Sequence, residues 1–146
     1  MRLACGVLFV AMTLGAATAP AASGTQEFQV VVHPTVRGTW ISRSSLQALF
    51  TGKPNLWGDK TPATPVDQSA KAPVRRAFAA SVLGLSIGEL QRYWQDRVAA
   101  ARIFPPPVKS SDEEVLGFVA ATAGAVGYVG PDIAIPEGVK VISVVD

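Results

Sequence analysis

The sequence predicts an α/β fold, in the form of a single small three-layer domain with a mostly parallel mixed sheet. Segments with helical periodicity separate most of the strand-like segments, and this alternation is typical of a sheet whose strands run mainly in parallel. The chain has 146 residues, which is enough for one domain. Cys5 is its only cysteine, so a disulfide framework is excluded and the hydrophobic core must hold the fold together.

Strand signals occur at four places along the chain. Apolar residues over 28–32 form the first strand, and His33-Pro34 ends it because proline cannot donate to a strand ladder. Two short strands are expected over 64–67 and 125–129, and Gly127 in the later one implies close approach of a neighbouring segment. Alternating apolar residues over 139–145 indicate the last strand.

Helix signals lie between these strands, and each helix has a recognisable start. Ser42 is a suitable cap, and Pro73 fits a first helical position, where its missing N–H costs nothing. Ser86 and Ser111 each precede a glutamate by three residues, the spacing of a capping box. Helices are therefore expected over 43–50, 73–84, 86–98 and 112–122, with loops over 33–41 and 51–63 and an irregular proline-containing segment over 99–109.

The first residues read as a secretory signal peptide. An apolar run over 3–16 follows Arg2 and leads into small residues, with Ala19-Pro20-Ala21 as an acceptable cleavage site. We assign 1–23 to a cleaved signal peptide and 24–146 to the mature domain. The run is too short for a stable membrane span, so we expect an exported periplasmic protein that does not span the membrane.

Charge and composition exclude several classes of function. Removing Arg2 from the 13 Lys and Arg residues leaves 12 against 11 Asp and Glu, with no basic tract, which argues against nucleic acid as a partner. His33 is the only histidine, so neither a metal site nor a Ser-His-Asp arrangement can be assembled around it. We expect no enzyme activity, no cofactor and no metal.

Three motifs follow one another in the mature chain. They are SLQALFTGK at 45–53 followed by Trp57; PVDQ at 65–68 leading into RRAF at 75–78 and VLG at 82–84; and SDEEVL at 111–116 followed by GAVGYV at 124–129. Their order and spacing resemble the substrate-binding proteins of phosphate ABC transporters, and above all the short single-domain members. The resemblance implies a reduced periplasmic-binding-protein type II fold of about one lobe, acting in phosphate transport by binding phosphate or a related small oxyanion.

The segment 64–84 contains the candidate anion site. A strand that feeds a polar loop and a helix start is a common solution to binding phosphate. Asp67, Gln68, Ser69 and Arg75 are the candidate ligand-binding residues here, and Thr35, which follows the first strand, is a further one. In the alternative interpretation Asp67 and Gln68 satisfy loop backbone groups and the arginines are solvated.

Two features of this segment bear on how it would bind. The resemblance implies a serine before Pro73, but the sequence has Ala72 at that position. A single lobe also leaves one side of an anion in water. For these two reasons we expect anion binding to be weak. If one arginine points inward, burial of neighbouring apolar residues favours Arg75 over Arg76.

A second function stays open: a protein-interaction module of the cell envelope that keeps the fold without the ligand. Its candidate apolar patch consists of Tyr93, Trp94, Phe104 and 105–107.

Overall fold

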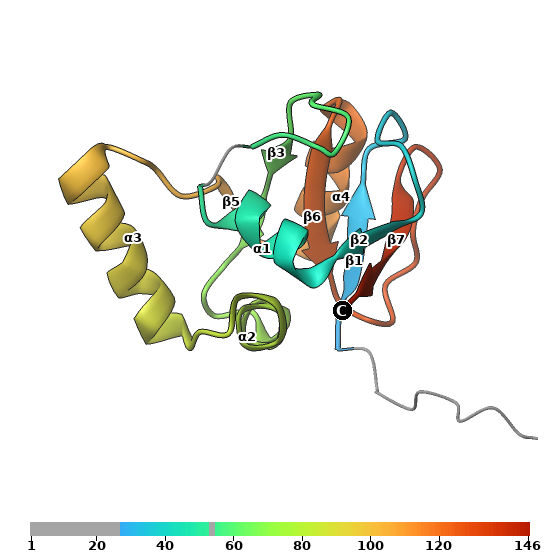
Figure 1. Ribbon diagram of the computed structural model, residues 1–146. Coiled ribbons are helices and arrows are strands. Elements are labelled where there is room, and N and C mark those ends of the chain that lie inside the picture. The colour runs from blue at the N-terminus through green and yellow to red at the C-terminus, as the bar shows by residue number, and fades with distance from the viewer. Residues whose placement is uncertain (1–26, 53–54) are drawn as a thin grey trace, which may run out of the picture.

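The computed structural model describes residues 27–52 and 55–146 (Figure 1). The predicted signal peptide and Lys53 of the first motif lie outside these residues. In chain order the elements are β1 (Gln29–Val32), β2 (Trp40–Ser42), α1 (Arg43–Phe50), β3 (Thr64–Pro65), β4 (Asp67–Gln68), α2 (Pro73–Phe78), the π-helical turn η1 (Ala79–Leu83), α3 (Ile87–Ala101), β5 (Val108–Lys109), α4 (Asp112–Ala121), β6 (Ala125–Val129) and β7 (Lys140–Val145). The predicted α/β class is confirmed.

One strand of the main sheet runs against the others. The five strands lie in the order β2-β7-β1-β6-β3, and β1 pairs antiparallel with both β7 and β6. The outer pairs, β2 with β7 and β3 with β6, are parallel. The sheet is therefore mixed, as predicted, and four of its five strands share one direction.

Short strands are where the sequence prediction is wrong. The expected loop over 33–41 ends in β2, a three-residue edge strand that exists only through its pairing with β7. The expected strand over 64–67 divides at Val66, whose N–H still donates to Val126 in the main sheet (2.8 Å). Beyond it, β4 leaves that sheet and pairs in parallel with β5, inside the segment expected to be irregular. This division places β4 in a separate two-stranded sheet with β5.

Helix starts follow the capping predictions closely. The Ser42 and Ser86 side chains accept hydrogen bonds from the third residue beyond them, and Glu89 completes the box at Ser86. At α4 only half of the box forms, because the carboxylate of Glu114 bonds Ser110 instead of Ser111. Helix α3 continues to Ala101, three residues beyond the prediction, as the alanines at its end favour helix.

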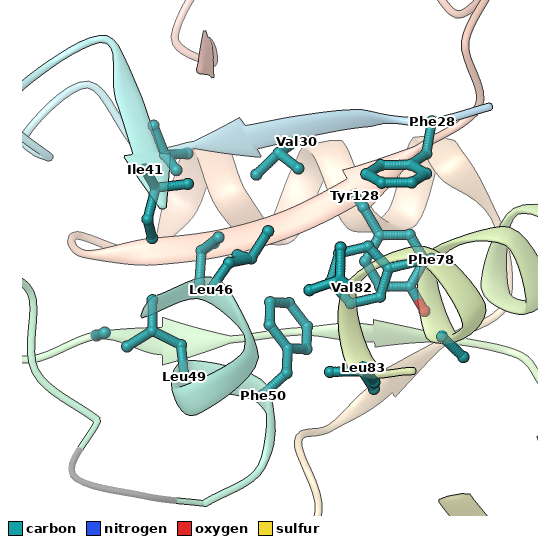
Figure 2. Close-up of a cluster of buried hydrophobic side chains, with 14 of the residues drawn as sticks. Phe28, Val30, Ile41, Leu46, Leu49, Phe50, Phe78, Val82, Leu83 and Tyr128 are labelled. Carbon is teal, nitrogen blue, oxygen red and sulfur yellow. The ribbon is translucent and has the colours of Figure 1, made fainter. Parts of the chain in front are cut away.

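Two hydrophobic clusters lie on the two faces of the sheet and give the predicted three layers. Val30 and Val32 belong to the larger cluster, under α1 and α2, whereas Val31 belongs to the cluster under α4, because successive strand residues point to opposite faces. In the larger cluster the rings of Phe78 and Tyr128 are stacked, with centroids 3.9 Å apart (Figure 2). No helix within 27–52 and 55–146 has the length and apolar character needed to cross a membrane.

Gly127 confirms the predicted close approach on the face under α4. A Cβ at this position would lie 2.8 Å from methyl groups of both Val115 and Val66. Helix α4 therefore lies against β6 at a distance that only glycine permits.

Candidate ligand site

Four of the five candidate residues come together where β4 leads into α2. The guanidinium of Arg75 donates to the carbonyl of Gln68, and its Nη1 lies 3.2 Å from Oδ2 of Asp67. Ser69 follows Gln68 in the chain, is half-buried, and accepts a hydrogen bond at its Oγ from the N–H of Lys71 (3.3 Å). Arg75 points inward, with 12% of its side chain exposed, whereas Arg76 is exposed, as the burial of their neighbours predicted.

Thr35 lies at the opposite end of the sheet from this group. Its Oγ1 accepts from the N–H of Gly124 (3.2 Å) and shares a hydrogen bond with His33 (2.8 Å). Gly124 precedes β6, while Asp67 follows β3, and these two strands run in parallel. The structure therefore does not bring Thr35 to the site formed by the other four residues.

Asp67 is a buried carboxylate with several partners. It is 5% exposed and accepts hydrogen bonds from the Tyr128 hydroxyl and the Gln68 N–H (2.8 Å), besides its ion pair with Arg75. Burial raises the pKa of Asp67, and the charge of Arg75 and the bonds from Tyr128 and Gln68 offset only part of that rise. Burial also raises the pKa of Tyr128, and the neighbouring carboxylate raises it further.

Gln68 joins three elements through its side chain. Its Nε2 donates to Oδ1 of Asp112 (2.6 Å) at the start of α4 and to the carbonyl of Tyr128 (2.9 Å) in β6. Only 2% of Gln68 is exposed. The hydrogen bonds of Asp67 and Gln68 are thus largely taken up by the protein, and the geometry favours the interpretation that they satisfy internal groups.

Arg75 keeps unused hydrogen-bond capacity. Its Nη1 is occupied by Gln68 and Asp67, but its Nε is buried without any partner. Within the described parts of the chain its Nη2 makes no hydrogen bond either. These two groups share one edge of the guanidinium, the edge that binds carboxylate or phosphate bidentately. Of the candidate residues, Arg75 therefore offers the clearest free donors.

A cleft of about 790 Å³ adjoins this arginine. Helix α3 stands away from the main sheet (Figure 1), and its residues form one wall of the cleft. The opposite wall comes from the β4–α2 segment and from the stretch before and within β5. The lining residues are Asp67, Ser69, Ala70, Arg75, Ile87, Gln91, Trp94, Gln95, Val98, Ala99, Pro105 and Val108.

Sequence reasoning found Arg75 but not its surroundings. No sequence motif indicated that α3 would line the cleft, which it does through Trp94 and Val98. Tyr128 stood within a recognised motif, but its bond to Asp67 spans 61 positions. Within 27–52 and 55–146 no group of three or more metal-ligating side chains occurs. The unpaired donors of Arg75 beside the cleft are suited to holding a ligand.

Solved structures of phosphate receptors resemble this chain. An ABC-type phosphate transport receptor from Vibrio cholerae matches with a TM-score of 0.63 at 20% identity, covering 81% of this chain and 46% of the receptor. PstS from Borrelia burgdorferi matches with a TM-score of 0.63 at 17% identity, covering 81% of this chain and 47% of that protein. No protein-family model and no curated protein matches the sequence.

These matches confirm, for the fold, the resemblance seen in the three motifs. The chain has the architecture of part of such a receptor and spans less than half of its length.

Proposed function

We propose that this chain is an exported, non-enzymatic binding domain that holds phosphate or a related small oxyanion weakly at Ser69 and Arg75. The observation that carries the proposal is the buried, unpaired Nε of Arg75, a residue that lines an open cleft. The fold shared with phosphate transport receptors supports the same class of ligand.

Weak binding follows from how much of the anion the chain can surround. Asp67 and Gln68 are committed to internal hydrogen bonds, so Arg75 and Ser69 are left as donors. A hydrogen bond to an anion that remains partly in water is weaker than one in an enclosed site. We expect a Kd on the order of 1 mM, equivalent to about −4.1 kcal/mol.

Titration of the purified protein with phosphate and sulfate, followed by amide NMR, tests the proposal. Amide signals over 69–75 should move in a saturable way, and Ser69→Ala should weaken the effect. Arg76→Gln is the matched control, since Arg76 is exposed and does not line the cleft. Signals that stay fixed at about ten times the expected Kd would overturn the oxyanion proposal.

Export is part of the same proposal and has its own test. The sequence of 1–23 supports cleavage between Ala19 and Gly24. Protein recovered from the periplasmic fraction should therefore begin within that window. Full-length protein confined to the cytoplasm would contradict export.

An exposed apolar strip along β2 and β7 favours the second candidate function, an interaction module of the cell envelope. Trp40 in β2 is 63% exposed and pairs in register with Ser143, which lies on the same face of β7 as Val141 (42% exposed) and Val145 (39%). Of the patch expected from the sequence, Trp94 is buried and Phe104 is 68% exposed.

Envelope cross-linking with Trp40→Ser against Phe104→Ser distinguishes the two surfaces. The interaction proposal expects one stable partner that Trp40→Ser loses and Phe104→Ser retains. Equal recovery with both variants, or no partner with the unmodified protein, would count against it.

A further inference from the structure

We infer that the cleft beside α3 binds an organic anion, with an acidic head group at Arg75 and an apolar body against α3. The inference deepens the proposed function and rests on it, because both place the acidic group at Arg75. It goes further by naming the part of the ligand that inorganic phosphate lacks.

The size of the cleft is the first reason. A volume of about 790 Å³ falls within the range of about 300–1,000 Å³ found for sites that hold drug-sized organic ligands. An inorganic oxyanion would leave most of this space to water.

The division of charge between the walls is the second reason. Helix α3 contributes apolar side chains, chiefly Ile87, Trp94 and Val98, with two neutral glutamines and no ionisable group. The opposite wall adds Pro105 and Val108, and Val108 is 56% exposed. Trp94 is already buried, so an apolar ligand body between these walls would remove mainly the other apolar side chains from water, which favours binding.

The identity of the head group follows from unused hydrogen-bond capacity. Asp67 and Arg75 are the only ionisable groups that line the cleft in the described parts of the chain. Asp67 already accepts from Tyr128 and Gln68 and pairs with Arg75, whereas Arg75 retains a buried Nε without an acceptor. A carboxylate or phosphate monoester supplies the acceptor that this edge lacks, and a cationic head group would not.

Calorimetric titration with three probes tests the inference: hexyl phosphate, inorganic phosphate and hexanol. Hexyl phosphate should bind at least about tenfold more tightly than inorganic phosphate, since burial of two methylenes accounts for that ratio. Hexanol should bind more weakly than hexyl phosphate, because it lacks the acidic head group.

Two variants of α3 localise the effect. Ala99 is exposed and lines the cleft, so the indole of Ala99→Trp should occupy the part of the cleft beside α3 and abolish the advantage of hexyl phosphate while leaving inorganic phosphate binding unchanged. Ala100→Trp is the matched control, because Ala100 is also exposed and does not line the cleft, and it should leave all three affinities unchanged.

The possible results separate the two proposals. Inorganic phosphate binding as tightly as hexyl phosphate would overturn the inference and leave the proposed function standing. Binding of hexyl phosphate without any binding of inorganic phosphate would support the inference and overturn the small-oxyanion proposal. Hexanol matching hexyl phosphate would overturn the role of Arg75. A dimer in sedimentation that Ala99→Trp dissociates would overturn the inference in favour of a second copy of the chain.

Discussion

The hydroxyl of Tyr128 donates a hydrogen bond to the carboxylate of Asp67, and both residues are buried. The Tyr128 ring is held by stacking on Phe78, so the position of the hydroxyl is set by the hydrophobic core. Asp67 in turn pairs with Arg75 at the edge of the cleft (3.2 Å). The core thereby positions the arginine on which the proposed ligand site depends.

Removing the Tyr128 hydroxyl should destabilise the protein. Tyr128→Phe leaves a buried carboxylate short of one donor, and we expect the free energy of unfolding to fall by about 1–3 kcal/mol in urea titrations. Tyr93→Phe is the matched control, since its hydroxyl donates to a neutral carbonyl, that of Thr51 (2.8 Å), and should cost about 0.5–1.5 kcal/mol. A larger loss for Tyr93→Phe would contradict the role given to Asp67.

Asp67 should make stability fall as pH rises. Burial raises its pKa in the folded state, so the folded protein holds this proton to a higher pH than the unfolded chain, where the pKa is about 3.9. The stability contributed in this way is fully present below about pH 3.9 and is lost as pH rises through the folded-state pKa. The difference in unfolding free energy between unmodified protein and Asp67→Asn should therefore shrink from about pH 4 upward. A difference that grows with pH would show that Arg75 and the hydrogen bonds outweigh burial.

The Asp67–Arg75 pair should show strong coupling in a double-mutant cycle. Their side chains are only 7% and 12% exposed, so Arg75→Met alone leaves a buried charge unpaired and should cost about 3–5 kcal/mol at neutral pH. Adding Asp67→Asn removes that charge and should recover part of the loss. Additive effects of the two substitutions in chemical unfolding would indicate that the pair is not coupled.

Gly124 should tolerate substitution less well than another glycine of similar backbone conformation. Gly124 and Gly138 have φ of +76° and +85°, but a Cβ at Gly124 would lie 2.3 Å from the carbonyl oxygen of Pro62, whereas at Gly138 it would meet open space. Gly138→Ala should cost about 1–2 kcal/mol from backbone strain alone. Gly124→Ala should cost clearly more in thermal unfolding, and equal losses would argue against the close approach to Pro62.

Local signals in the sequence predicted the helices and the long strands. Serine caps, Pro73 and apolar periodicity act within a few residues, so they place α1, α3 and α4 to within a turn. The short strands β2 and β5 depend on partners far along the chain, and three or two residues carry too little periodicity to reveal them. The loop signals around Pro105 therefore predicted an irregular segment where β5 forms.

For the candidate site, the sequence predicted the segment and the inward arginine but not the state of its neighbours. Asp67 and Gln68 carry the polar groups that a ligand would use. Whether such groups face a ligand or the protein depends on Tyr128 and Asp112, which lie 61 and 44 positions away. Only the tertiary structure brings those partners within reach.

The position of β1 determines when the sheet can form during synthesis. β1 is the middle strand, yet Gln29 pairs with Val129 and Val30 with Ile142, so these partners are synthesised 100 and 112 positions after it. Contacts so distant in sequence must wait for closure of a long loop, which slows folding. β1 therefore stays without its native neighbours until β6 and β7 have both been synthesised.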